Sequence, residues 1–145
     1  MRRAILAVVL LAGCSAPRPA PPVETPAATL PADLPRDGVA SADGTYFVAF
    51  ASVPSPIPAN AEFALDVAVL TPDRRALVPD AALAIDATMP AHGHGMNVVP
   101  RVVPAGSGRF RVEGLVWHMS GAWRIDFDVT RGAVTERAQA NVEID

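Results

Sequence analysis

Histidine and methionine, residue types that bind soft metal ions, gather in one part of the sequence. All three histidines and three of the four methionines lie between Met89 and Met119. They include two groups, His92-Gly93-His94-Gly95-Met96 and His118-Met119. Imidazole and thioether donors together favour copper, above all Cu(I), over magnesium or calcium, whereas zinc more usually takes cysteine or carboxylate beside histidine. The candidate metal ligands are therefore His92, His94, Met96, His118 and Met119.

The first group has a spacing that could aim its donors at one place. In an extended strand, side chains alternate between the two faces, so His92, His94 and Met96 would share a face. Gly93 and Gly95 add no bulk between them and allow backbone angles that other residues avoid.

Each candidate ligand also has a purely structural interpretation. Residues 92–95 could form a glycine-rich turn whose imidazoles are solvated or hold the loop in place. His118 lies near a turn and could hydrogen-bond a backbone carbonyl, and Met119 could fill a gap in the core. Met89 continues the apolar alternation of the residues before it, so we expect it in the core and not among the ligands.

Alternating apolar and polar residues predict the strands that must position these side chains. About seven short strands, separated by turn signals and without a convincing amphipathic helix, predict an all-β domain over residues 44–145. Its expected fold is an immunoglobulin-like antiparallel β-sandwich, with a small closed barrel as the alternative. The clearest strand patterns cover residues 46–50, 63–69, 83–85, 110–112, 123–129 and 134–144.

The N-terminus has the parts of a lipoprotein signal in the right order. Arg2 and Arg3 precede the apolar run Ala4 to Ala12, which is too short to span a bilayer because a span needs about 20 apolar residues. Leu11-Ala12-Gly13-Cys14 resembles the lipobox of bacterial lipoproteins. We therefore predict a signal peptide at 1–13, lipidation of Cys14 and a stable membrane anchor facing the periplasm. Ser15, by resemblance to enterobacterial sorting, favours the outer over the inner membrane.

Residues 14–43 are predicted to be the lipidated cysteine and a Pro-rich linker. Seven prolines lie between Ser15 and Asp43. Proline lacks an amide hydrogen, so this stretch is expected to join neither a sheet nor a long helix. It should extend as a tether on the order of 80 Å long at about 3.1 Å per residue, or serve as a ligand for a proline-binding domain.

Charge and composition argue against two classes of function. Net charge is −3, and removal of Arg2 and Arg3 with the leader leaves ten basic against fifteen acidic residues, or −5. Nucleic acid is therefore not an expected partner, because its phosphates need clustered basic residues. The sequence has no nucleophile elbow, no carboxylate pair beside a histidine and no phosphate-binding loop before a helix, so we do not expect an enzyme.

Two strings, ATMPAHGHGM and GLVWHMSGAWRIDFDV, resemble the YtkA-like domain. That family has a Met-Pro…His-Gly-Met segment before a hairpin and a later Met-Pro-Gly-x-Trp segment, in which Ser120 stands here where proline is usual. The resemblance covers roughly residues 60–130. It implies a small extracytoplasmic β-sandwich, commonly membrane-tethered and related to FixH-type accessory proteins of metal pumps and oxidase assembly. The matching residues are Met89, Pro90, His92, His94, Gly95, Met96, Met119, Gly121 and Trp123.

The sequence leaves two functions open. The first is an envelope-anchored lipoprotein that binds or handles copper through its His/Met cluster, with a metal pump or an oxidase assembly component as the partner that the resemblance implies. The second is a non-catalytic interaction module that holds an envelope protein without metal.

Overall fold

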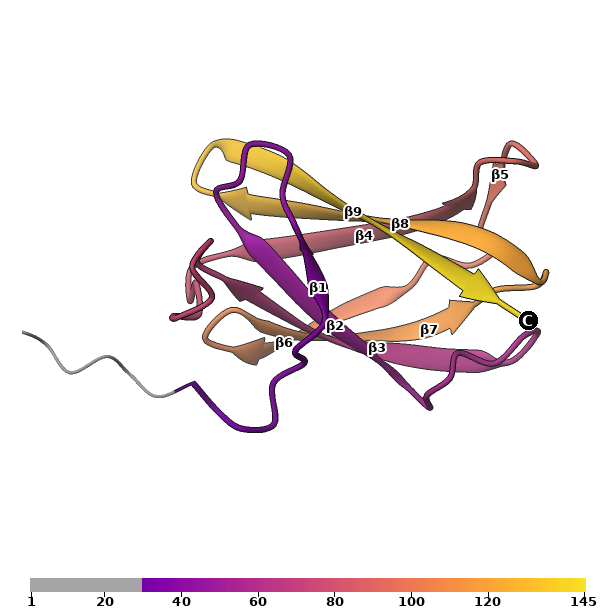
Figure 1. Cartoon of the computed structure of the whole chain (residues 1–145), viewed down its shortest axis with the longest axis horizontal. Coiled ribbons are helices and arrows are strands. Elements are labelled where there is room, and N and C mark those ends of the chain that lie inside the picture. The colour runs from indigo at the N-terminus through magenta and orange to yellow at the C-terminus, as the bar shows by residue number, and fades with distance from the viewer. Residues whose placement is uncertain (1–29) are drawn as a thin grey trace, which may run out of the picture.

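The computed structural model describes residues 30–145, so the predicted signal peptide, Cys14 and half of the predicted linker lie outside the described residues. No helix between residues 30 and 145 is long and apolar enough to cross a membrane. Residues 30–145 form nine strands that face each other in two sheets (Figure 1). The strands are β1 (Gly38–Ala40), β2 (Phe47–Val53), β3 (Glu62–Leu70), β4 (Ala82–Met89), β5 (His94–Gly95), β6 (Arg101–Gly106), β7 (Arg109–Val116), β8 (Gly121–Arg131) and β9 (Val134–Ile144).

The strand order confirms an immunoglobulin-like antiparallel sandwich. One sheet has the order β1-β2-β3-β7-β6 and the other the order β5-β4-β8-β9. Strands β2-β3-β7-β6 and β4-β8-β9 are arranged as the two sheets of the seven-stranded immunoglobulin fold. The count exceeds the predicted seven because β1 and β5, three and two residues long, add short edge strands. Because the strands form two separate sheets, the alternative of a closed barrel is excluded.

The predicted apolar alternation fills the space between the sheets. Along β8, every second residue from Trp123 to Val129 is fully buried, and burial of each large apolar side chain stabilises the fold by about 1.5–3 kcal/mol. Asp126 departs from the alternation because it is also buried, although it points outward. Gln139 and Arg137 cover it and donate hydrogen bonds to its carboxylate at 2.9 and 3.3 Å.

The folded domain begins before the predicted boundary at residue 44. Strand β1 lies within the predicted linker, yet it pairs with β2 from Gly38↔Ala49 to Ala40↔Phe47. The prolines of the linker do not prevent this pairing, because none of them lies within β1 or β2. Pro35 precedes β1, and the next proline, Pro54, follows β2. The expectation that the whole of 14–43 stays out of a sheet is therefore wrong for its last residues.

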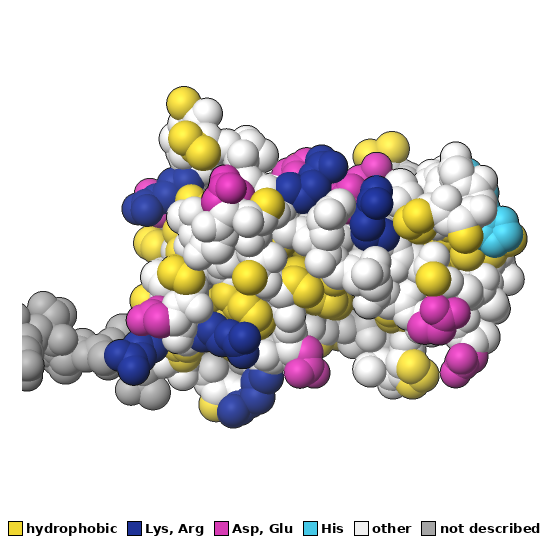
Figure 2. All heavy atoms as spheres, turned by 45° about the horizontal axis from the view of Figure 1, so that its top comes forward, with side chains coloured by type: hydrophobic (Ala, Val, Ile, Leu, Met, Phe, Trp, Pro, Cys, Tyr) yellow, Lys and Arg dark blue, Asp and Glu magenta, His cyan; other side chains and the backbone are white. Residues whose placement is uncertain are grey.

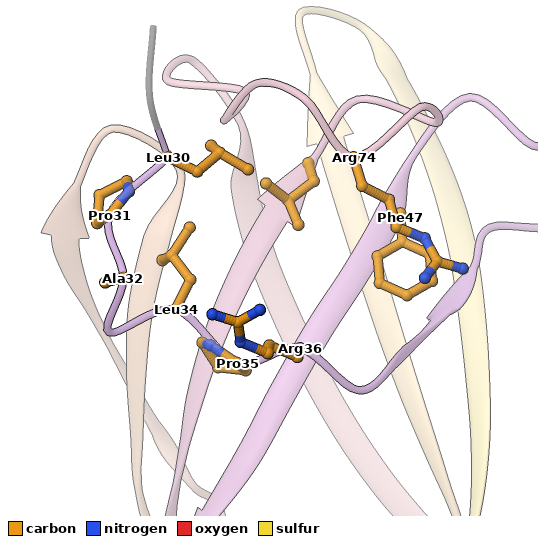
Figure 3. A pocket seen from close by; sticks show the side chains of 9 residues that line it. Leu30, Pro31, Ala32, Leu34, Pro35, Arg36, Phe47 and Arg74 are labelled. Carbon is orange, nitrogen blue, oxygen red and sulfur yellow. The ribbon is translucent and has the colours of Figure 1, made fainter.

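Residues ahead of β1 also pack on the first sheet (Figure 3). Leu30 and Leu34 contact a small apolar cluster that includes the buried Phe47 and Leu70. They line a pocket of about 390 Å³ with Phe47 and Leu70 in its wall. Arg109 donates a hydrogen bond of 2.7 Å to Asp33. The chain therefore enters the domain at the end of the first sheet where β2 starts and β3 stops.

Candidate metal site

The two histidine-containing segments meet at the opposite end of the sandwich. Residues 90–93 join β4 to β5, and residues 117–120 join β7 to β8. The end of β4 pairs with the start of β8 through Thr88↔Arg124, so the turn and the loop are neighbours. The loop also adjoins the start of β3, because Glu62 pairs with Val116. Figure 2 shows histidine side chains at one end of the surface, beside apolar ones.

The first segment is a tight turn and not the continuous strand that would put all three of its donors on one face. The Met89 carbonyl accepts hydrogen bonds from the amides of His92 and Gly93, both at 3.0 Å. Gly93 has a φ of +67°, in the left-handed region that other residues adopt only with strain. His92 consequently lies in the turn with its side chain exposed.

The predicted alternation does hold for His94 and Met96. His94 pairs with Met89, and the Met96 amide donates a 3.1 Å hydrogen bond to the Ala87 carbonyl. Directly opposed residues of an antiparallel pair share a face, and both Met89 and Ala87 are buried in the core. His94 and Met96 therefore point inward from the edge of the second sheet, and both are half-buried.

His94 and His118 form a stacked imidazole pair. Their ring centroids are 5.1 Å apart and their planes differ by 29°. The ring of His92 lies 5.8 Å from that of His94, tilted by 36°. The structure thus brings together three imidazoles from two separate segments of backbone.

A buried tryptophan pair supports the imidazoles, and the sequence analysis did not single it out. Trp117 and Trp123 are fully buried and stack in parallel at 5.2 Å and 4°. Trp123 stands nearly perpendicular to His118 at 5.8 Å and to His94 at 6.2 Å. Because the indole is almost equally far from both imidazoles, it flanks their stack and does not extend it. Trp117 directly precedes His118 in the sequence, and this adjacency could have indicated that a tryptophan lies beside the imidazoles.

The ring nitrogens of the stacked pair differ in their partners. The Nδ1 atom of His118 is buried and has no hydrogen-bond partner among the described residues, although leaving such an atom unpaired costs about 1–3 kcal/mol. The Nδ1 atom of His94 lies 3.3 Å from the Gly95 carbonyl oxygen. Metal-bound imidazoles commonly donate their second N–H to a carbonyl in this way, which leaves Nε2 as the ligand atom.

Among the described methionines, Met89 lies in the core, whereas Met96 and Met119 lie at the edge of the core. Met89 is only 1% exposed, which confirms that it belongs to the core. A Cβ at Gly121 would lie 3.2 Å from the Cε atom of Met89, and the φ of +118° at Gly121 also favours glycine. Met96 and Met119 are half-buried and pack against the main core. The Met119 carbonyl accepts a 2.9 Å hydrogen bond from the Trp123 indole, which holds the β7–β8 loop in place.

A shallow pocket of about 300 Å³ opens beside His94. Thr88 and Arg124 form part of its wall. The Nε atom of Arg124 lies 3.2 Å from the buried carboxylate of Asp126, which partly offsets the positive charge beside the pocket.

The donor types limit what this end of the sandwich can hold. Among residues 30–145, no three His, Cys, Asp or Glu side chains lie close enough together to hold a metal ion. The stacked pair, His94 and His118, is the candidate imidazole pair, and Met96 and Met119 are the half-buried thioethers of the same two segments. Imidazole with thioether is a donor set suited to copper.

Comparison with protein-family models, with curated proteins and with solved structures gave no match. The relation of residues 89–96 and 119–123 to the YtkA-like domain therefore stays a prediction.

Proposed function

We propose that this protein is an envelope-anchored lipoprotein whose β-sandwich binds copper as Cu(I). The ligands are His94, His118 and one thioether, from Met96 or Met119. The observation that carries the proposal is the stacked His94–His118 pair, in which the buried Nδ1 atom of His118 has no hydrogen-bond partner among residues 30–145. A ring nitrogen without a hydrogen-bond partner is available to bind a metal ion.

The oxidation state follows from charge and donor softness. Imidazole and thioether are neutral, so the ion's own charge is not cancelled by its ligands. The penalty for removing an ion from water rises with the square of its charge, so a monovalent ion is less costly to hold in a half-buried site than a divalent one. Thioether sulfur also prefers Cu(I). Both effects favour Cu(I) over Cu(II) and zinc.

The cellular setting of the proposal comes from the sequence. Lipidation at Cys14 would hold the domain at the membrane, facing the periplasm, with the outer membrane favoured by Ser15. The YtkA-like resemblance supports a role in copper handling with a metal pump or an oxidase assembly component as partner.

Anaerobic competition titration of the mature protein in detergent with Cu(I) and a chromogenic chelator tests this function. We expect one Cu(I) per chain and a loss of affinity of at least about tenfold in H94A and in H118A. The volume-conserving variants M96L and M119L identify the thioether ligand. N97A, a change at an exposed residue of the same segment, is the control. Micromolar or weaker binding that neither histidine variant alters would leave the metal-independent interaction module as the function.

A further inference from the structure

The three imidazoles form a row that runs from solvent to the core. His92 is exposed in the β4–β5 turn, whereas His94 and His118 are half-buried. The centroid steps are 5.8 Å from His92 to His94 and 5.1 Å from His94 to His118. The fully buried Trp123 flanks the inner two rings, 6.2 Å from His94 and 5.8 Å from His118.

The outer imidazole differs from the inner pair in its exposure and in its geometry. The ring of His92 lies tilted beside that of His94, whereas the rings of His94 and His118 stack. The backbone of His92 is nonetheless fixed by the 3.0 Å hydrogen bond from its amide to the Met89 carbonyl. A solvent-exposed imidazole is thus held one ring away from a candidate resident ligand.

We infer that His92 is the exchange ligand of this site, through which Cu(I) enters and leaves. The inference rests on the proposed copper-binding function. In uptake, a bond from copper to a His92 nitrogen forms as the bond to one ligand of the donor breaks. Bonds to His94 and His118 then form as the remaining donor ligands and His92 dissociate. Copper stays Cu(I) throughout, so no electron is transferred, and release follows the same steps in reverse.

An exchange ligand affects the rates of copper uptake and release but not the equilibrium affinity for copper. The dissociation constant is the ratio of the release rate to the association rate. A group that binds the metal only in transit lowers the barrier equally in both directions, so its loss slows both rates by one factor and leaves the ratio unchanged. Loss of a resident ligand instead weakens the equilibrium affinity, mainly through faster release.

The test is stopped-flow transfer of Cu(I) to and from a chromogenic chelator, with the mature protein in detergent, alongside an equilibrium titration of each variant. For H92A we expect a dissociation constant within about twofold of wild type and uptake and release each slower by about tenfold. H92M should restore the rates, because a thioether also binds Cu(I). H118A should lose affinity, and N97A should match wild type in both measurements.

Two results would overturn the inference while leaving copper binding intact. If H92A loses as much affinity as H118A, His92 is a resident ligand. If H92A exchanges copper at the wild-type rates, His92 has no part in transfer. Absence of Cu(I) binding by the wild-type protein in the titration would overturn the proposed function and this inference together, so the two failures are distinguishable.

Discussion

The imidazoles of His94 and His118 stack at 5.1 Å, although one belongs to an edge strand and the other to a loop between the two sheets. Neither ring could reach this position without the strand order of the sandwich, in which β5 and β8 flank β4. Trp123 on β8 contacts both rings from the side. The pair is therefore set against a rigid part of the core while its outer side meets solvent at the β4–β5 turn.

Intrinsic fluorescence should report metal binding directly. The chain has two tryptophans, and both belong to the stack beneath the imidazoles, with Trp123 within 6.2 Å of His94 and 5.8 Å of His118. Copper held by these imidazoles would quench the indole emission, and the change should saturate at one equivalent. H118A should abolish the effect. Stoichiometric binding without any change in emission would place the copper away from the stacked pair.

Replacement of Gly93 should damage the turn that carries His92 and His94. The space around its Cα is open, since a Cβ would meet nothing within 4 Å, so the effect arises from its φ of +67° alone. Gly93→Ala should lower the free energy of unfolding by about 1–2 kcal/mol. Gly93→Asn should cost less, because asparagine tolerates the left-handed region better. Denaturant titrations of the two variants compare them, and equal losses would contradict this account.

Acid stability should depend on Glu136, a buried residue of β9. Burial raises the pKa of Glu136, but hydrogen bonds from Ser41, Thr45 and the backbone N–H of Asp43 together hold that pKa below its ordinary value. Because the folded pKa is the lower one, the stabilisation is complete above the unfolded pKa of about 4.3 and is lost as the pH falls through the folded pKa.

Glu136→Gln tests this dependence. It should lower the free energy of unfolding at pH 7 by about 1 kcal/mol and reduce the loss of stability below about pH 5. Glu143→Gln, on the same strand but exposed, is the matched control and should leave the acid profile unchanged. Parallel acid profiles for wild type and Glu136→Gln would show that this carboxylate does not contribute.

Removal of the residues before 44 should destabilise the domain, contrary to what the predicted boundary implies. A chain that begins at residue 44 lacks β1 and the contacts of Leu30 and Leu34 with the apolar cluster of the first sheet. We expect it to unfold with at least about 2 kcal/mol less stability than a chain that begins at residue 30, since burial of one large apolar side chain contributes about 1.5–3 kcal/mol. Equal denaturation midpoints would show that residues 30–43 behave as a free linker.

Local patterns in the sequence predicted those features that depend on neighbouring residues alone. Alternation placed Trp123 to Val129 in a half-buried strand and Met89 in the core, and both placements are confirmed. The position of His92 could not be predicted in the same way. A glycine-rich segment fits a strand or a turn equally well. In the structure it forms a turn, in which the Met89 carbonyl accepts hydrogen bonds from the amides of both His92 and Gly93.

Features that depend on distant segments were not available from the sequence. The contact between His94 and His118 requires the order of β4, β5 and β8 in one sheet, which local alternation does not determine. Strand β1 was hidden by the prolines before it and by its length, because its three residues form a strand only when β2 supplies the pairing partner. Trp117 and Trp123 came together for a similar reason, from either side of a loop that crosses between the sheets.

The chain enters at one end of the sandwich and the histidines lie at the other, so the length of the sandwich separates the two. Strands β8 and β9 have eleven residues each and at about 3.3 Å per residue span roughly 35 Å. Leu30, Leu34 and β1 fix the N-terminal segment to the first sheet at the near end. The two histidine-containing segments lie at the far end, where a docking partner would meet them without touching that N-terminal segment.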